Sequence, residues 1–398
     1  MIGRQARAPA RCDLLIVGAG PAGCAAAVAA RSAAPDLSIA IIDRARFPRD
    51  KLCGGAITGG GLRELELAGL ELRVVHVPVS EVELRVDGRR VRGRLPRPAA
   101  VVRRREWDAD LVNQARARGV TVLEEAPLLG LSEEVADTGA GPIAFRALVC
   151  ADGSAGPSRR LLGLQPGVRA PLREAWVPGE GAARLVFDLD AAGVQGYAWR
   201  FPSRAEDGSL LENCGIYAAE LEPGFDLSRA LAGWAKSEGL AVEGQPEAWA
   251  LRLAEPGGPV GQGRALLCGD ALGADPLAGE GIRYALWSGR IAGRLAGQAL
   301  HRGKRPSLRR YRRRLALSRS GVTLWLFVHL ARRIHRLAPR PGDWRGMALD
   351  RAVVAGLASA ISGAPLFTTG AALLWRYALL RGGVGRSGRQ PSTRELDG

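Results

Sequence analysis

The stretch Asp13-Leu14-Leu15-Ile16-Val17-Gly18-Ala19-Gly20-Pro21-Ala22-Gly23 decides the fold of this chain. Its apolar first half predicts a β-strand, its glycines predict a tight turn, and the Ala-rich residues 24–34 predict a helix. A second apolar run, residues 37–42, ends on Asp43, about 20 residues after the last glycine. This order and spacing predict a Rossmann-type unit that binds a dinucleotide.

Each glycine of this fingerprint has a physical role. Gly18 permits the tight turn, Gly20 lets backbone N–H groups approach a pyrophosphate, and Gly23 lets the helix pack closely on the strand. The helix N-terminus faces the anion, and Asp43 is placed for the adenosine ribose. A Gly-rich surface turn is the alternative, and the strand, helix and acid around the glycines disfavour it.

The charge of the chain is concentrated at one end. The 398 residues are enough for two or three core-bearing units, and their net charge is +16. Residues 301–398 hold 20 Lys and Arg but 4 Asp and Glu, so the first 300 residues are neutral. This distribution disfavours nucleic-acid binding by the whole protein and favours a basic tail that meets an anionic surface.

The six cysteines form no CxxC pair, which argues against zinc and iron–sulfur sites. Cys12, Cys150 and Cys268 are expected to be buried free thiols. No apolar signal segment precedes the first strand, so we expect a cytoplasmic protein, peripheral on the cytoplasmic membrane if its tail binds lipid.

The remaining chain alternates between two patterns. Alternating residues 74–95, with the turn Asp87-Gly88, predict a β-hairpin on another sheet, and residues 171–262 predict a mostly antiparallel sheet. Elements that fit the Rossmann-type unit are predicted between these two β-rich segments and after the second one. The predicted helices cover 109–118, 158–162 and 282–295, and the predicted strands cover 120–123, 144–151 and 264–268.

Four further motifs accompany the fingerprint: Lys51-Leu52-Cys53-Gly54-Gly55, Ala151-Asp152-Gly153-Ser154, Tyr197-Ala198-Trp199-Arg200-Phe201-Pro202, and Gly269-Asp270 followed by Pro276 and Gly279-Glu280-Gly281-Ile282. Over roughly residues 11–300 the chain resembles the FAD-dependent geranylgeranyl reductase family, within the flavoproteins shaped like para-hydroxybenzoate hydroxylase. The Cys-Gly-Gly loop and the YxWxFP element distinguish the reductases from the wider group.

The resemblance implies an α/β fold with a Rossmann-like FAD-binding domain, an inserted, mostly antiparallel β-sheet substrate domain and a C-terminal helical segment. The FAD-binding domain is expected at 1–70, 101–170 and 262–300, and the substrate domain at 71–100 and 171–261. A basic helical segment is expected at 301–380, and residues 381–398 are expected to be disordered.

The resemblance also implies site residues. Asp43 would hold the adenosine ribose, Arg104 the diphosphate side and Asp270 the ribityl or diphosphate region, while residues 279–282 would cradle the flavin pyrimidine edge. Many relatives have Glu where this chain has Asp43. The complete set implied for FAD is Gly18, Gly20, Pro21, Ala22, Gly23, Asp43, Arg44, Cys53, Gly54, Gly55, Arg104, Asp152, Gly269, Asp270, Pro276, Gly279, Gly281 and Ile282.

The residues implied for catalysis are Cys53, Tyr197 and Trp199. The thiol of Cys53 would lie where a substrate double bond needs a proton after hydride arrives, although a packing role for this thiol stays open. Tyr197 and Trp199 alternate with Phe201, so they also fit one apolar face of a strand.

The function implied is reduction of C=C bonds in an isoprenoid chain, with electrons from NAD(P)H or a ferredoxin or reductase partner. A flavin hydroxylase or halogenase is the rival enzyme; the WxWxIP element and catalytic Lys of halogenases are missing from the sequence. A non-catalytic prenyl-binding protein is the alternative from another class, and the intact fingerprint speaks against it.

The tail contains a charge-free run, residues 352–375. Its length would suit a membrane-spanning helix, but its glycines, proline and hydroxyl side chains make it weakly hydrophobic. We expect helices that cap the substrate site and rest on an anionic membrane surface. A helical pack with a solvated basic face is the alternative.

Overall fold

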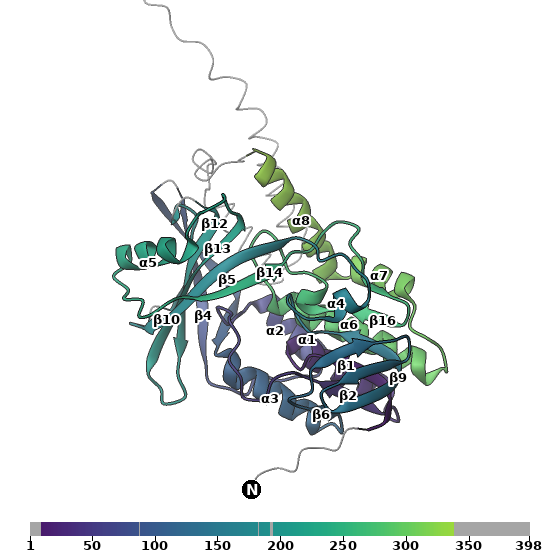
Figure 1. The fold of residues 1–398 in the computed structure, drawn as a ribbon. Helices are drawn as coiled ribbons and strands as arrows, with labels where there is room; N and C mark the ends of the chain where they lie inside the picture. Colours follow the sequence, from purple (N-terminus) through teal and green to yellow (C-terminus); the bar gives the residue numbers. More distant parts are fainter. Residues whose placement is uncertain (1–8, 87, 182, 192–193, 338–398) are drawn as a thin grey trace, which may run out of the picture.

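Two eight-stranded sheets organise the chain in the computed structural model, which describes residues 9–86, 88–181, 183–191 and 194–337. Figure 1 shows them side by side, the first at the lower right and the second at the upper left. The second sheet carries α5 (Leu227–Ser237) on its outer side. The α/β class with an inserted, mostly antiparallel sheet and C-terminal helices is confirmed.

The first sheet is built around the fingerprint strand. β1 pairs in parallel with β2 on one side and β9 on the other, and the order is β15-β16-β9-β1-β2-β6, with β7 and β8 joined to β9. The strand bounds are β1 (Arg11–Val17), β2 (Ile39–Ile42), β6 (Thr121–Leu123), β7 (Leu128–Leu131), β8 (Val135–Thr138), β9 (Gly141–Cys150), β15 (Gly261–Gln262) and β16 (Ala265–Leu267).

The second sheet has the order β14-β10-β13-β12-β11-β4-β5-β3, and its pairs are antiparallel except β11 with β4. The predicted hairpin is β4 with β5. The bounds are β3 (Ala56–Ile57), β4 (His76–Val86), β5 (Arg89–Val102), β10 (Arg169–Pro178), β11 (Arg184–Asp188), β12 (Gln195–Arg204), β13 (Leu210–Glu220) and β14 (Glu247–Arg252). The domain division remains our proposal; β3, which lies within the range 1–70 proposed for the FAD-binding domain, pairs with β5 of the second sheet.

The remaining helices are α1 (Pro21–Ala33), α2 (Gly59–Leu67), α3 (Arg104–Arg116), α4 (Ser158–Leu161), η2 (Gly269–Ala271), α6 (Ile282–His301), α7 (Leu308–Ala316) and α8 (Arg319–Leu337). The prediction of a helix starting at residue 109 was wrong, because α3 starts at Arg104. Arg104 reaches Asp108 one turn later with two hydrogen bonds of 2.7 Å, which stabilise an earlier first turn.

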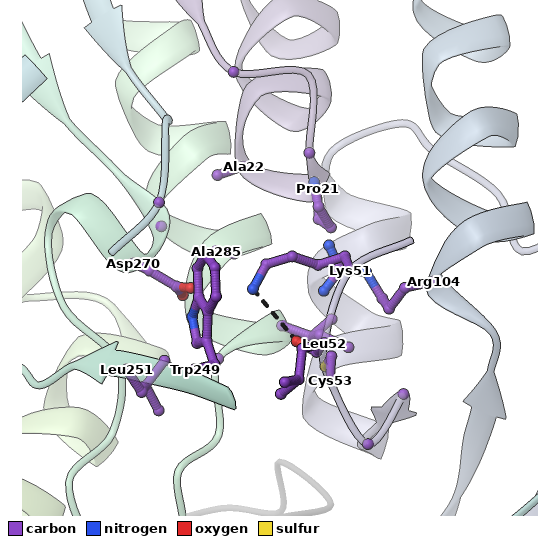
Figure 2. Close-up of a pocket in the computed structure, with 18 of the residues that line it drawn as sticks. Pro21, Ala22, Lys51, Leu52, Cys53, Arg104, Trp249, Leu251, Asp270 and Ala285 are labelled. Carbon is purple, nitrogen blue, oxygen red and sulfur yellow. Dashed lines mark hydrogen bonds between the residues drawn. The ribbon is translucent and has the colours of Figure 1, made fainter. Parts of the chain in front are cut away.

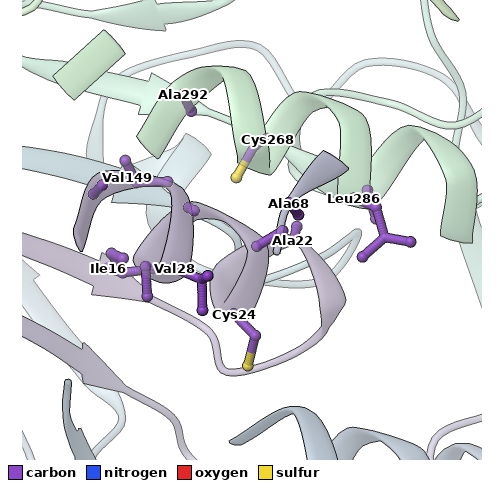
Figure 3. Close-up of a cluster of buried hydrophobic side chains, with 14 of the residues drawn as sticks. Ile16, Ala22, Cys24, Val28, Ala68, Val149, Cys268, Leu286 and Ala292 are labelled. Atoms are coloured by element: carbon purple, nitrogen blue, oxygen red, sulfur yellow. The ribbon is translucent and has the colours of Figure 1, made fainter. Parts of the chain in front are cut away.

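The core of the first unit lies where α1 and α6 pack against β1 and β9 (Figure 3). A Cβ atom at Gly289 or Gly293 of α6 would lie 2.1 or 1.9 Å from the carbonyl oxygens of Ala22 and Ala26. The two helices therefore touch backbone to backbone, and the start of α1 is held rigidly. Cys12, Cys150 and Cys268 are buried free thiols, as predicted.

The basic segment begins with α7 and α8. Tyr311 of α7 is fully buried, and its hydroxyl donates to the carbonyl of Leu267 at 2.8 Å, so α7 is part of the first unit. No helix among the described residues combines the length and apolar character needed to cross a bilayer. The expectations for the run 352–375 and for the tail 381–398 lie outside the described residues.

Candidate functional site

A cavity of about 700 Å³ lies where the first unit meets the second sheet. One half is lined by the glycine turn, by residues 42–45 and by the loop from Arg49 to Ala56. The other half is lined by β10, β11, β12 and β14, and residues 278–282 lie between them. The size is within the usual range of about 300–1,000 Å³ for small-molecule sites.

The glycine turn presents the start of α1 to this cavity. Gly18 has φ +101°, and a Cβ there would lie 2.4 Å from the carbonyl oxygen of Ala151, so only glycine fits. At Gly20 a Cβ would meet only Arg49 Nη2, at 3.8 Å. Because Gly20 is the N-cap of α1 and provides no side chain, the first N–H groups of the helix are free for an anion.

Asp43, at the end of β2, fixes this turn. Its Oδ2 accepts a hydrogen bond from the N–H of Ala19 at 2.7 Å, and its Oδ1 accepts one from the N–H of Ala45 at 2.9 Å. The carboxylate also lines the cavity. Asp43 therefore connects the glycine turn to the adjacent loop at the place expected for a ribose.

Arg104 lies in the same half of the cavity and is held by Asp108. Its pKa is raised, since Asp108 more than offsets the effect of burial. Arg49 makes a second contact with Asp108, at 3.0 Å. This buried carboxylate thus holds two guanidinium groups beside the helix N-terminus, where they can meet a diphosphate.

The loop after Asp270 is held by its own carboxylate and by two tyrosines. Asp275 accepts hydrogen bonds from the N–H groups of Leu277 and Ala278, and burial raises its pKa to about 7. Tyr197 donates to the carbonyl of Ala278 at 2.5 Å, and Tyr217 donates to that of Pro276 at 3.1 Å. The second sheet therefore sets the position of this loop.

The Cys53–Gly54 loop packs directly on the YxWxFP strand. A Cβ at Gly54 would lie 2.8 Å from the ring of Phe201 and 3.2 Å from Trp199 Nε1, so a side chain would push the loop off these aromatics. Trp199 is oriented by a hydrogen bond of 2.7 Å to Asn213 Oδ1. Cys53 is half-buried and lines the cavity.

Aromatic rings cover the second half of the cavity. Phe187 contacts Tyr197 and Phe201 edge to face, both at 5.3 Å between centroids, and Tyr197 lies 5.3 Å from Tyr217. Leu172, Leu185 and Leu251 complete this wall. It is an apolar surface that fits a hydrocarbon chain.

Lys51 crosses the cavity between the two halves. Its Nζ lies 3.8 Å from the ring centroid of Trp249 on β14 and donates to the carbonyl of Leu52 at 3.3 Å. Figure 2 shows Lys51 pointing toward Trp249, with Asp270 nearby. Burial lowers the pKa of Lys51, and Asp270 opposes that change.

Arg283, next to Ile282, connects the cavity loop with α8. Its guanidinium lies 3.9 Å from the Glu280 carboxylate and 3.4 Å from the hydroxyl oxygens of Ser320 and Thr323. Ser320 in turn donates to Glu64 of α2 at 2.7 Å. This buried polar network joins the flank of the cavity to the basic helices.

The cavity brings together all the sequence-predicted site residues except Gly23 and Pro276. Gly23 has the packing role that the fingerprint gives it, since a Cβ there would lie 1.8 Å from the carbonyl oxygen of Gly18. Pro276 contributes its carbonyl to Tyr217.

Sequence reasoning missed Glu174, Trp249 and Tyr217, which line the cavity, and also the roles of Arg49 and Lys51. The three wall residues are isolated on separate strands of the second sheet, and no local motif marks them. Lys51 belongs to the Lys-x-Cys-Gly-Gly motif, so the sequence did indicate that it lies near the cavity.

Comparisons with known proteins identify relatives. No protein-family model matches the chain. A menaquinone reductase of Mycobacterium tuberculosis is 30% identical over 319 residues, which cover 71% of this chain and 76% of the relative. Digeranylgeranylglycerophospholipid reductase 2 of Methanopyrus kandleri is 31% identical over 317 residues, 72% of this chain and 77% of that protein.

Solved structures share the fold. A geranylgeranyl bacteriochlorophyll reductase-like protein of Thermoplasma acidophilum superposes with a TM-score of 0.71 at 18% identity, over 94% of this chain and 98% of that one. The flavin-dependent brominase Bmp2, as a triple mutant, gives a TM-score of 0.67 at 18% identity, over 93% and 99%. With relatives at this identity and coverage, the chain belongs to the geranylgeranyl reductase family of FAD-dependent oxidoreductases.

Proposed function

We propose that this protein uses FAD to reduce C=C bonds of an isoprenoid chain on a lipid, quinone or pigment precursor. One observation carries the proposal: a dinucleotide-type turn and an aromatic wall face the same cavity and meet at the Cys53–Gly54 loop. The names of the relatives, which specify a menaquinone and a digeranylgeranylglycerophospholipid, support an isoprenoid substrate.

The residues present fit FAD. The backbone N–H groups of Gly20 and Ala22 at the start of α1, with Arg49 and Arg104 beside them, suit its diphosphate. Asp43, expected to hold the ribose, and the backbone of residues 279–282, expected to cradle the flavin ring, both line the cavity. When bound and reduced, FAD supplies the hydride that an alkene takes up.

The protein must contribute placement, a dry surface and a proton. An isolated alkene is weakly electrophilic, so Trp199, Phe201 and Phe187 serve to hold it in line and exclude water. Tyr197 keeps the loop from Ala278 onward in position. We propose that the thiol of Cys53, on the loop between the two halves, donates the proton.

The source of electrons is NAD(P)H or a ferredoxin-type partner in this proposal. The half of the cavity that would bind the isoprenoid is apolar, whereas both electron donors are polar. We therefore propose that the donor and the isoprenoid reach the flavin by different routes. The sequence holds no second nucleotide fingerprint, as in the flavoprotein hydroxylases that it resembles.

We also propose that α7 and α8 rest on an anionic membrane surface. Leu317, Val322 and Trp325 are exposed by 71%, 41% and 61%, which is high for large apolar side chains. The preceding helix α7 carries five arginines: Arg309, Arg310, Arg312, Arg313 and Arg314. Apolar side chains beside arginines suit the interface between acyl chains and lipid phosphates.

An anaerobic reoxidation experiment tests the reductase function. The flavin is reduced chemically, and menaquinone, geranylgeranyl diphosphate and oxygen are added in separate reactions. We expect prenyl substrate to reoxidise the flavin without oxygen and to yield a saturated bond. Product that forms only with oxygen and carries a hydroxyl would replace the reductase with a hydroxylase. A purified protein that binds prenyl compounds but contains no flavin would favour the alternative of a non-catalytic prenyl-binding protein.

A further inference from the structure

Glu174, Gly215 and Trp199 lie side by side on three neighbouring strands of the second sheet. Glu174 of β10 pairs with Gly215 of β13, and Gly215 pairs with Trp199 of β12. Directly paired residues project from the same face of a sheet, and both Glu174 and Trp199 line the cavity. The row of side chains that faces the cavity therefore has a gap at Gly215.

The indole of Trp199 fills this gap. A Cβ at Gly215 would lie 2.1 Å from Cζ2 and 2.3 Å from Cη2 of Trp199, so the six-membered ring lies against the backbone of β13. Because β13 stands between β12 and β10, the indole leans across the sheet towards the strand that carries Glu174. Only glycine at position 215 leaves room for this arrangement.

Asn213 holds the indole in place. It is fully buried and lies two residues before Gly215 on β13, so it shares the cavity-facing side of the strand. An indole N–H can only donate, so the amide oxygen of Asn213 must face Trp199, and the hydrogen bond is 2.7 Å long. Asn213 is a diagonal neighbour of both Trp199 and Glu174, because both of these residues pair with Gly215.

Glu174 holds the Cys53–Gly54 loop against the same indole. Its side chain is 1% exposed, and its Oε1 accepts a hydrogen bond from the backbone N–H of Cys53 at 3.0 Å. Burial raises the pKa of Glu174 to about 7, and the Cys53 N–H and the Asn213 amide oppose this rise because nearby donors stabilise the carboxylate. A Cβ at Gly54 would lie 3.2 Å from Trp199 Nε1, so one loop contacts both Glu174 and Trp199.

On the basis of the proposed function, we propose that Glu174 and Asn213 are positioning residues that lock the Cys53 loop and the Trp199 indole into one arrangement. They act through these two residues and do not touch the substrate. In the proposed reaction Trp199 aligns the alkene and Cys53 lies on the loop that faces it, so the lock fixes their separation. A misplacement of about 1 Å can slow a reaction by roughly 10²-fold, so loss of the lock should be visible in the rate.

The test compares Glu174→Met and Asn213→Leu with the wild type as full-length, FAD-loaded proteins. Each variant leaves one buried N–H group without its acceptor, that of Cys53 or that of the Trp199 indole. The flavin is reduced chemically and reoxidised anaerobically by geranylgeranyl diphosphate in a single turnover. We expect the maximal rate per bound flavin to fall roughly tenfold or more in each variant, with a smaller change in the probe concentration that gives half of that rate. Ser203→Ala, which removes a buried hydroxyl of β12 that makes no hydrogen bond with the described residues, should react as the wild type does.

The conservative variant Glu174→Gln separates positioning from acid–base chemistry. Glutamine keeps an oxygen that accepts the Cys53 N–H but has no acidic proton, so its rate should stay within about twofold of wild type. A loss as large as that in Glu174→Met would overturn the positioning role, because the acid itself would then be needed. The double variant Glu174→Met/Asn213→Leu should be little slower than the slower single variant, since both changes break one lock. Fully additive losses would show that the two residues act independently and would overturn the shared lock.

Hydrogen exchange gives a readout without turnover. In the wild-type flavoprotein the amide of Cys53, followed by mass spectrometry of the segment 49–56, and the indole N–H of Trp199, followed by NMR of ¹⁵N-tryptophan, should both exchange slowly. Glu174→Met should speed exchange at Cys53 roughly tenfold or more, Asn213→Leu should do so at Trp199, and Glu174→Gln should match the wild type. Fast exchange at Cys53 in the wild type, or unaltered exchange in Glu174→Met and Asn213→Leu, would overturn the lock. A wild type that shows this protection but reduces no prenyl probe would instead overturn the proposed function.

Discussion

The hydroxyl of Tyr197 donates a hydrogen bond to the carbonyl oxygen of Ala278, 2.5 Å away, and so joins the second sheet to the loop at the cavity's flank. Tyr197→Phe removes this bond alone, which is worth about 1 kcal/mol. We expect roughly fivefold weaker FAD binding, measured by flavin fluorescence titration of the apoprotein.

Tyr284→Phe is the matched control. Tyr284 is buried on α6, and its hydroxyl makes no hydrogen bond with the described residues. This variant should bind FAD as the wild type does. Equal affinities for all three proteins would show that the Ala278 contact does not shape the flavin site.

Gly20→Val should yield flavin-free protein. The new side chain would extend into the cavity beside Arg49, where the diphosphate needs space. The ratio of flavin to protein absorbance after purification measures the effect. Gly233→Val on the exposed face of α5, where a Cβ meets nothing within 4 Å, should stay fully yellow. Full FAD occupancy in Gly20→Val would refute the assignment of the turn.

Cys53→Ala should keep the flavin and its reduction by the donor but slow alkene reduction, roughly 10²-fold if the thiol is the general acid. Single-turnover reoxidation by a prenyl substrate measures this step. Cys12→Ala, a buried thiol on β1, serves as the control. Unaltered reoxidation in Cys53→Ala would make Cys53 a packing residue.

The raised pKa of Glu174 has a consequence for stability. The folded carboxyl keeps its proton up to about pH 7, whereas the unfolded one releases it near its ordinary value of 4.5. Folding therefore takes up a proton in this window, and stability falls as pH rises through it.

Glu174→Gln removes this loss of stability. The free energy of unfolding of the variant apoprotein should therefore exceed that of the wild type by roughly 2–3 kcal/mol above pH 7, and by much less at pH 4.5. Urea unfolding at both pH values measures the difference. Asp275 titrates in the same window but is present in both proteins, so it cancels. A difference that does not vary with pH would contradict an elevated pKa of Glu174.

Membrane binding should depend on the arginines of α7. Truncation after residue 300 is unsuitable, because it would remove the buried Tyr311. Arg312 is also best kept, since it donates to the carbonyl of Gly258 at 3.1 Å. Changing Arg309, Arg310, Arg313 and Arg314 to Gln should weaken binding to anionic vesicles by about 1 kcal/mol per charge at low salt.

Vesicle sedimentation with and without high salt measures this binding. The same change at the exposed Arg89, Arg90 and Arg94 of β5 is the control, which removes three positive charges from another element. Vesicle binding that is equally strong after neutralisation of α7 would remove the electrostatic part of the proposal. If Trp325→Ala alone abolishes vesicle binding, the binding depends on insertion of apolar side chains.

The dinucleotide half of the site was predictable because its determinants are local. Gly18, Gly20 and Asp43 act within one strand–turn–helix–strand unit, so their spacing alone indicates their geometry. Glu174 and Trp249 come together only through the register of β10 and β14, which no short motif encodes. The start of α3 was missed although Arg104 and Glu106 are good helix formers. The Arg104–Asp108 pair that stabilises this first turn becomes visible only in the structure.

Arg283 touches both Glu280 at the cavity and Thr323 on α8, within two residues of the exposed Trp325. If α8 lies on a bilayer, the loop of residues 278–282, which lines the cavity, is anchored to that bilayer through Arg283. The catalyst and its water-insoluble substrate are then confined to one plane. For such an enzyme the governing concentration is the mole fraction of substrate in the lipid, so turnover should change with surface dilution by inert phospholipid at constant bulk concentration.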